Sequence, residues 1–151
     1  MGKLMNQQIR AKRTTGLSMG KMQCRSIFAG KAKGILLLTS QPISFYGGVD
    51  ADTGVVVEKG HELEGKSVSG KILAFPQGKG STVGSYILYR LKKNNAAPLA
   101  IINREAETIV AVGAIISEIP MVDRADFRKL AKASGKTVEV DAAKGTILTP
   151  K

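Results

Sequence analysis

Cysteine is nearly absent from this sequence: the chain of 151 residues has one, Cys24. A single cysteine excludes a disulfide framework within the chain and is compatible with a reducing compartment, so we expect a cytoplasmic protein. It also excludes a zinc or iron–sulfur centre held by cysteines of this chain alone. Long hydrophobic runs are absent too. Apolar stretches such as residues 35–38 are too short to span a membrane, and no segment near the start resembles a secretory signal.

Acidic residues are missing from the N-terminal part of the chain. Residues 1–49 hold eight Lys or Arg and no Asp or Glu, whereas the remainder holds 15 basic and 12 acidic residues. Most of the net charge of +11 therefore belongs to the N-terminal part. Residues 1–21 have no sustained helical period and no aromatic side chains that could stack on bases. We predict a flexible basic extension over 1–21 and a folded domain over 22–151, with RNA or an acidic partner surface as the alternative role of the extension.

Glycine, by contrast, is plentiful, with 17 residues against five prolines, which indicates tight turns within a fold. Short apolar runs and helical spacing predict strands over 24–30, 32–40, 71–76, 97–103 and 119–124, helices over 82–95, 104–118 and 125–136, and a terminal hairpin over 137–150. We expect the first two strands to form a strand–turn–strand and the helix over 104–118 to be mostly buried. The alternation of strands and helices in the second half predicts a parallel sheet in a single α/β domain.

The glycine-rich stretch PQGKGSTVGSY, residues 76–86, lies between a predicted strand and a predicted helix. Ligands of open α/β sheets bind beyond the carboxyl ends of the strands. Gly78 and Gly80 allow positive φ and close approach of a ligand, and Lys79 adds a positive charge. Ser81 or Thr82 can cap the helix, whose free N–H groups attract an anion. The spacing matches neither a Walker loop, nor the dinucleotide fingerprint, nor a nucleophile elbow. The residues alone leave open whether this loop binds an anion or only caps a helix.

Other polar residues offer weaker candidates. His61 is the only histidine and stands in a polar loop, so we expect it at the surface. Asp50 and Asp52 share one loop without further clustered ligands, which favours turn formation over a metal site. Cys24 at the start of a strand is expected to be buried. We therefore predict no metal site in this chain.

Three linked stretches are more specific than any single motif. They are residues 43–56 (ISFYGGVDADTGVV), 60–91 (GHELEGKSVSGKILAFPQGKGSTVGSYILYRL) and 106–123 (AETIVAVGAIISEIPMVD). In order and spacing they closely resemble the small subunit of the aconitase X family. The resemblance implies a single swivelling β/β/α domain like the swivel domain of aconitase, here on a separate chain. The segment before Cys24 lies outside the resemblance.

The resemblance also implies a function. Family members of this type belong to a hydro-lyase that dehydrates (R)-5-phosphomevalonate to trans-anhydromevalonate 5-phosphate, in a modified mevalonate route to isoprenoids. A large subunit is expected as the partner in a heterodimer, and its cysteines are expected to bind a 4Fe–4S cluster that takes the C3 hydroxyl. The residue matching the family's base is Ser81, which would take the C2 proton. The remaining substrate-binding residues implied are Gly47, Gly48, Asp50, Gly78, Lys79, Gly80 and Thr82.

Three alternatives remain open from the sequence. A swivelling phosphoryl-carrier domain shares the glycine-rich loop before a helix, but its histidine should lie at the helix start, where His61 does not. A basic RNA-binding domain would explain the N-terminal charge but not the loops. Within the aconitase X family, the small subunit of a cis-3-hydroxy-L-proline dehydratase is the closest rival, because substrate choice lies largely with the large subunit.

Overall fold

The structure is a computed structural model that describes residues 19–150. Strand β1 (Met19–Gln23) pairs antiparallel with β8 (Thr146–Pro150), and the pairing begins at Met19 opposite Pro150. The expected boundary between residues 21 and 22 therefore falls inside a strand. Residues on both sides of that boundary belong to the strand because the register of β1 with β8 places Met22 in the core. The expected flexibility of the extension concerns residues that lie mostly outside the described range.

The described residues contain the predicted strands and helices of the α/β domain. In chain order the elements are β1, β2 (Arg25–Phe28), β3 (Lys31–Leu38), α2 (Phe45–Gly48), β4 (Ile72–Phe75), α3 (Gly84–Lys93), β5 (Ala100–Asn103), α4 (Thr108–Ser117), β6 (Met121–Asp123), α5 (Phe127–Ala131), β7 (Thr137–Asp141) and β8. The terminal hairpin is confirmed, because β7 and β8 pair antiparallel. The two strands predicted on either side of Gly30 are present as β2 and β3, but they do not pair with each other: β2 pairs with β6, and β3 pairs with β7 and β4.

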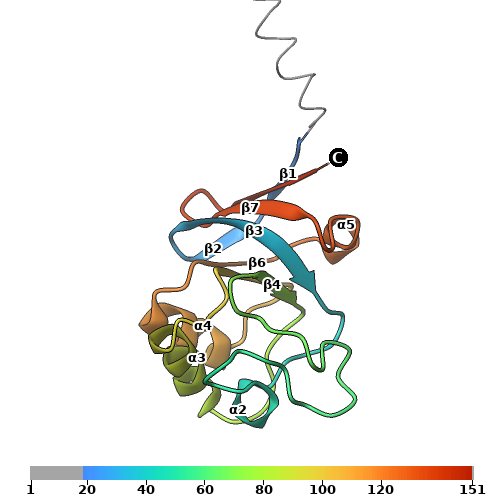
Figure 1. The fold of residues 1–151 in the computed structure, drawn as a ribbon. Helices are drawn as coiled ribbons and strands as arrows, with labels where there is room; N and C mark the ends of the chain where they lie inside the picture. The colour runs from blue at the N-terminus through green and yellow to red at the C-terminus, as the bar shows by residue number, and fades with distance from the viewer. Residues whose placement is uncertain (1–18, 151) are drawn as a thin grey trace, which may run out of the picture.

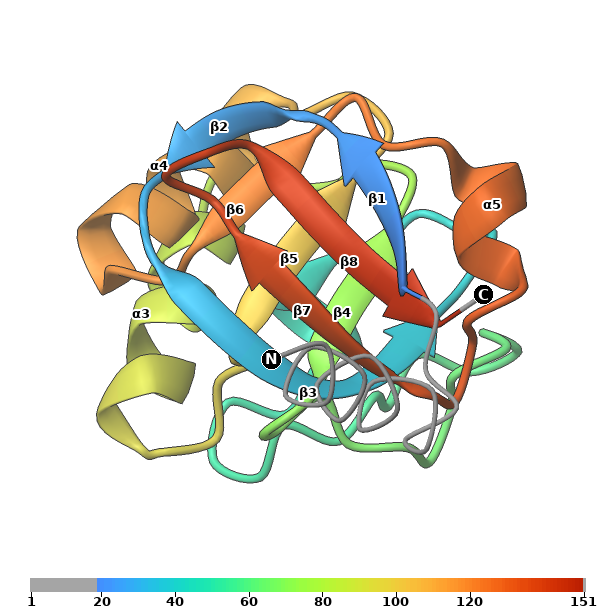
Figure 2. The ribbon, with the colours of Figure 1, turned by 90° about the horizontal axis from the view of Figure 1, so that it is seen from above.

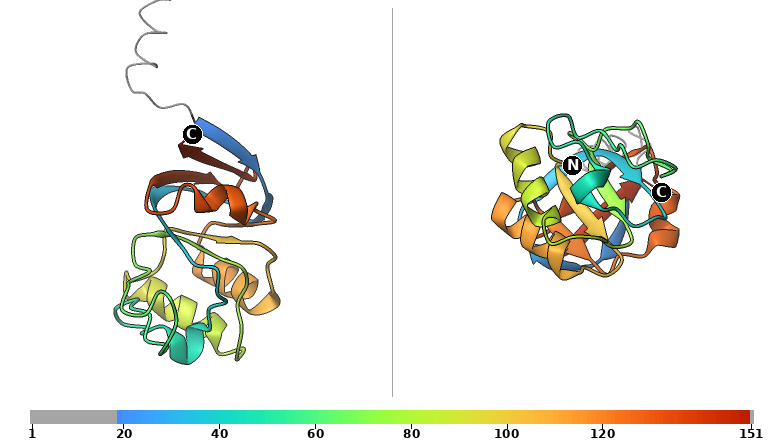
Figure 3. Two further views of the ribbon diagram at one scale, coloured as in Figure 1. Left: turned by 90° about the vertical axis from the view of Figure 1, so that its right-hand side faces the viewer. Right: turned by 90° about the horizontal axis from the view of Figure 1, so that it is seen from below.

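Strand β3 joins two parts of the sheet, whose order is β1-β8-β7-β3-β4-β5-β6-β2. Its residues 31–35 pair antiparallel with β7, and its residues 36–38 pair parallel with β4. Strands β4, β5 and β6 are parallel, as predicted. The sheet folds over at β3, so that β7, β8 and β1 lie above the parallel strands (Figures 1 and 2). Helices α3 and α4 cover the other face, which gives three layers in the side view of Figure 3.

The parallel strands are buried on both faces, and alternate side chains enter two cores. On β4, Leu73 and Phe75 pack toward the helices, whereas Ile72 and Ala74 pack between the two sheet layers. Each fully buried Leu or Ile contributes about 1.5–3 kcal/mol relative to an exposed one. This double burial fixes the carboxyl end of β4, where the glycine-rich loop begins.

The two helices of the outer layer differ in how well the sequence predicted them. Helix α3 buries Ile87, Leu88 and Leu91 on one face, as its period of apolar residues indicates. The expectation of a mostly buried α4 is wrong for one of its faces, where Val112, Ile115 and Ile116 are exposed. The opposite face packs closely on α3, and a Cβ added at its Gly113 would lie 2.5 Å from Leu88 Cδ1. Within residues 19–150, none of the helices combines the length and apolar character needed to cross a membrane.

Candidate functional site

Two loops far apart in the sequence meet at the carboxyl end of β4. Ile43 forms a parallel bridge with Gly78. The Ile43 N–H donates to Gln77 O at 3.3 Å, and the Lys79 N–H donates to Ile43 O at 3.0 Å. These bonds hold the α2 segment beside the glycine-rich loop, in the position where ligands of α/β sheets bind.

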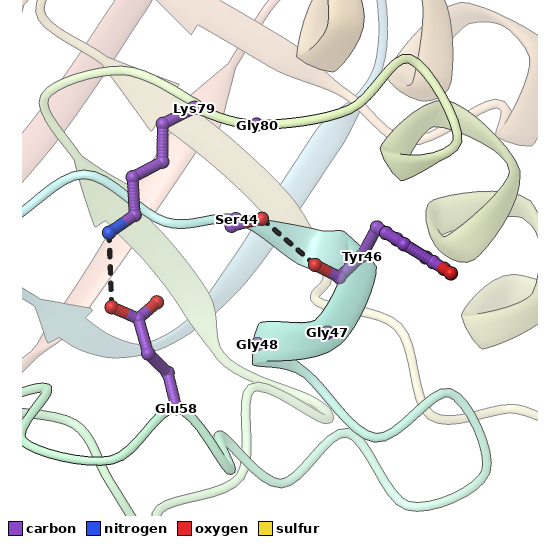
Figure 4. A pocket seen from close by; sticks show the side chains of 7 residues that line it. All are labelled: Ser44, Tyr46, Gly47, Gly48, Glu58, Lys79 and Gly80. Carbon is purple, nitrogen blue, oxygen red and sulfur yellow. Dashed lines mark hydrogen bonds and ion pairs between the residues drawn. The ribbon is translucent and has the colours of Figure 1, made fainter.

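A pocket of about 390 Å³ opens between the two loops. Its lining residues come from α2 and its N-terminal flank, from the following loop and from the glycine-rich loop: Ser44, Tyr46, Gly47, Gly48, Glu58, Lys79 and Gly80. Figure 4 shows these residues around the opening. The structure therefore brings together four of the predicted substrate-binding residues, namely Gly47, Gly48, Lys79 and Gly80.

Two of the pocket glycines have backbone conformations that favour glycine over other residues. Gly80 has φ of +95°, and a Cβ there would lie 2.6 Å from Ser44 Oγ on the opposing loop. Gly47 has φ of +85° with no other heavy atom within 4 Å of its added Cβ, so its side is open to a ligand. Positive φ is accessible to glycine without the steric cost other residues carry. The pocket wall is therefore bare backbone at both positions.

Ser81 follows the pocket and precedes α3. Its side chain is exposed, and its Oγ accepts a hydrogen bond from the Val83 N–H at 3.1 Å. The backbone N–H groups of Gly80, Ser81 and Thr82 donate to no acceptor within residues 19–150. These donors stand at the positive end of the helix dipole, where anions are stabilised. The segment can therefore receive an anion and can stabilise negative charge on the Ser81 oxygen.

An ion pair crosses the pocket. Lys79 Nζ lies 3.0 Å from Glu58 Oε2, and both side chains are partly exposed (Figure 4). Glu58 could not be predicted from the sequence, because this residue lies 21 residues from Lys79 and belongs to no motif. Ser44 and Tyr46 were not predicted as site residues either, although both lie just before the predicted pair Gly47–Gly48. Ser44 Oγ donates to Tyr46 O at 2.9 Å and shapes the turn of α2.

Four predicted site residues are not among the lining residues of this pocket: Ser81, described above, and Asp50, Gly78 and Thr82. The Asp50 carboxylate accepts hydrogen bonds from the N–H groups of Asp52 and Thr53, at 2.8 and 3.2 Å, and so forms a turn. Gly78 packs against α4, and a Cβ there would lie 2.5 Å from Val110 Cγ2. Thr82 lines a separate groove between α3 and α4. Their positions indicate that Asp50 and Gly78 determine the conformation of their loops.

His61 is buried, so the prediction of a surface histidine is wrong. Its Nδ1 accepts a hydrogen bond from the Leu63 N–H at 3.0 Å, which leaves Nε2 to carry the proton and donate to Pro42 O at 3.0 Å. Both contacts fix loops that lead to the pocket. The polar sequence around His61 does not predict this burial, because the burial depends on a contact with Pro42, which lies 19 residues earlier in the chain.

Two titratable groups with shifted pKa values, Cys24 and Asp123, lie in or beside β2 and β6, away from the pocket. Burial, with a smaller contribution from the Asp123 charge, raises the pKa of the half-buried Cys24 thiol to about 11. Burial opposes ionisation of Asp123, but hydrogen bonds from Arg25 and the Ala106 N–H outweigh it and lower the pKa of that carboxyl. Arg25 donates to both Asp123 oxygens, at 2.8 and 2.7 Å. The bonds between Arg25 and Asp123 tie β2 to β6 and are structural.

Known proteins are similar to this chain in sequence and in fold. The model of the aconitase X swivel domain family matches residues 21–149. The phosphomevalonate dehydratase small subunit of Thermococcus kodakarensis is 56% identical over 127 residues, which cover 84% of this chain and 94% of that protein. The protein of the same name from Methanosarcina mazei is 57% identical over 129 residues, covering 84% of this chain and 89% of that protein.

A solved structure agrees with this relationship. The crystal structure of Thermococcus kodakaraensis aconitase X in its holo-form matches with a TM-score of 0.84 and 54% sequence identity, and the match covers 87% of this chain and 99% of that chain. The three-layer arrangement of Figure 3 is therefore that of a swivelling β/β/α domain, as the sequence predicted. This chain belongs to the aconitase X swivel domain family.

Proposed function

We propose that this chain is the small subunit of a phosphomevalonate dehydratase. Such a hydro-lyase converts (R)-5-phosphomevalonate to trans-anhydromevalonate 5-phosphate, in a modified mevalonate route to isoprenoids. The observation that carries the proposal is the identity of 56% and 57% to relatives of that name over most of their length. Because those relatives are small subunits, the active enzyme is a heterodimer of this chain and a large subunit.

The reaction removes a proton from C2 and hydroxide from C3, and it leaves a C2=C3 double bond and water. It therefore needs a base and an electrophile. Within residues 19–150, no group of three or more His, Cys, Asp or Glu side chains could hold a metal ion. The one cysteine, Cys24, stands between β1 and β2. These residues do not fit a 4Fe–4S cluster, so we assign the cluster to the large subunit.

Ser81 is the proposed base. A serine hydroxyl is a poor base in water, and its alkoxide has to be stabilised by its surroundings. The Val83 N–H already donates to Ser81 Oγ at 3.1 Å, and the oxygen stands ahead of the first turn of α3. A donor to the charged form and the positive end of a helix both favour the alkoxide. Exclusion of water by the large subunit would strengthen these interactions further.

The substrate carries carboxylate and phosphate groups, and the glycine-rich loop offers matching donors. We assign the free N–H groups of Gly80, Ser81 and Thr82 to one anionic group, because they need no rearrangement to accept it. Lys79 supplies the cation, which exchanges its contact with Glu58 for the substrate. Gly47 and Gly48 form the opposing wall, where bare backbone admits the substrate.

The test is reconstitution under anaerobic conditions with the purified large subunit. The isolated chain is expected to be inactive, and the mixture is expected to dehydrate (R)-5-phosphomevalonate. A single chain that turned over this substrate would contradict the two-subunit proposal. Activity of the mixture on cis-3-hydroxy-L-proline, with none on phosphomevalonate, would keep the reaction class and replace the substrate.

A further inference from the structure

The outward face of α4 is apolar and uncharged. The helix reads TIVAVGAIIS, without a charged residue. Val112, Ile115 and Ile116 leave 42%, 46% and 44% of their surface exposed. A helix at the surface of a globular protein ordinarily turns charged side chains toward water. Contiguous apolar surface of this kind marks a binding face. Helix α4 thus has the composition of a helix covered on two sides, although only one side is covered within residues 19–150.

The apolar face continues across a groove to α3. The groove has a volume of about 410 Å³, and its lining comes from the two helices and from Thr82, two residues before α3: Thr82, Ser85, Tyr86, Thr108, Ile109, Val112 and Ile116. Tyr86 stands on the α3 side with 66% of its surface exposed. Ser85 Oγ donates to Ile109 O at 2.6 Å and ties the two helices together between their exposed faces. Figure 3 shows the two helices side by side in the outer layer.

The groove opens beside the proposed base. Thr82 lines it and follows Ser81 directly in the chain. A large subunit that covers Ser81 to complete and dry the site must therefore reach the end of the groove formed by Thr82 and Tyr86. We propose that the α3–α4 groove is the docking surface for an apolar segment of the large subunit, continuous with the active site. This inference rests on the proposed function.

The chemistry of the surface specifies its partner. Tyrosine is among the side chains that contribute most to binding at protein interfaces, and aliphatic side chains removed from water add hydrophobic stabilisation. The partner segment is therefore expected to present Leu, Ile, Met or Phe to the groove. Helix α3 ends with three cations, Arg90, Lys92 and Lys93. The neighbouring rim of the large subunit is accordingly expected to be acidic.

The experiment measures binding of the full-length chain to the purified large subunit by calorimetry. Ile116→Glu and Val112→Glu would each place a charge in the contact and are expected to raise the Kd at least about 30-fold. Melting temperatures of the free variants should stay close to that of the wild type, because both side chains face water. Leu99→Glu is the matched control, since Leu99 is 41% exposed and lies outside the groove. Hydrogen exchange should show new protection of α3 and α4 in the complex.

The outcomes separate this proposal from the proposed function. If both variants bind as tightly as the wild type and α4 gains no protection, the docking surface is refuted and the proposed function stands. If the wild-type chain does not bind the large subunit, both fail. If the substitutions abolish self-association of the isolated chain and leave large-subunit binding unchanged, a second copy occupies the groove and the proposal is wrong.

Discussion

Replacing Ser81 by alanine separates a base from a helix cap. In the free chain the hydroxyl accepts one hydrogen bond, from the Val83 N–H at 3.1 Å, and its side chain is exposed. The contact supports the turn ahead of α3, whose N-cap residue is Val83, and loss of such a hydrogen bond to a backbone N–H costs about 1 kcal/mol of stability. For a chain of this size that corresponds to a fall in Tm of about 2–4 °C. Ser81→Ala should therefore fold, and it should assemble with the large subunit.

The effect on catalysis is expected to be much larger. A positioned general base contributes about 10²–10⁴ in rate, equivalent to about 3–5 kcal/mol of transition-state stabilisation. The kcat of the assembled, cluster-loaded enzyme should fall by that factor, with KM nearly unchanged, because the backbone donors and Lys79 remain. The assay is steady-state dehydration of phosphomevalonate with the variant and wild-type complexes at equal cluster content.

Ser67→Ala is the matched control. Ser67 Oγ also accepts a hydrogen bond from the N–H two residues later, that of Ser69, at 3.1 Å, and it donates a second one to Thr53 O at 3.2 Å; Ser67 is not among the pocket residues. Its replacement should cost a similar amount of stability and leave kcat unchanged. If Ser81→Ala retained kcat within a few-fold of the wild type, the hydroxyl would be a cap and the assignment of the base would be wrong.

Three further predictions concern the fold. A chain that starts at Cys24 instead of Met19 loses β1 and buried Met22, so its free energy of unfolding should fall by at least about 2 kcal/mol in chemical denaturation. The lowered pKa of Asp123 means that its contribution to stability is present above the unfolded pKa of about 3.9 and is lost as pH falls through the folded value. Asp123→Asn should thus be less stable at neutral pH, with a shallower loss of stability in acid titration. Because burial raises its pKa to about 11, the Cys24 thiol holds about a hundredfold less thiolate at pH 8 than an ordinary thiol and should react more slowly with iodoacetamide, as measured by mass spectrometry.

Local sequence signals predicted the elements whose partners are close in the chain. The buried strand at Ile72–Phe75 and the helix at Gly84–Lys93 follow from apolar runs and helical spacing. Strand β1 gave no comparable signal, because its register depends on β8 at the other end of the chain. The strands on either side of Gly30 could be predicted, but their partners could not, since β2 and β3 each pair with strands far along the sequence.

The candidate site divides along the same line. The glycine-rich loop carries its own signals, so Lys79, Gly80 and Ser81 could be predicted together. Glu58 could not, because its contact with Lys79 depends on the path of an irregular loop. Helix α4 shows a different limit: an apolar sequence predicts that side chains are buried, but not whether the chain itself or a partner covers them. Val112 and Ile116 are exposed in the free chain, although the sequence around them is apolar.

The pairing of β1 with β8 also determines how the molecule can be handled. Met19 and Pro150 are register partners, so the two ends of the described fold lie side by side. Figure 1 places them at the pole opposite α2 and α3. A chain immobilised on a sensor surface through either end would therefore present its helices and glycine-rich loop to solution. The same geometry would let a fluorescent reporter or a covalent tether be attached without obstructing the pocket beside the glycine-rich loop or the groove between α3 and α4.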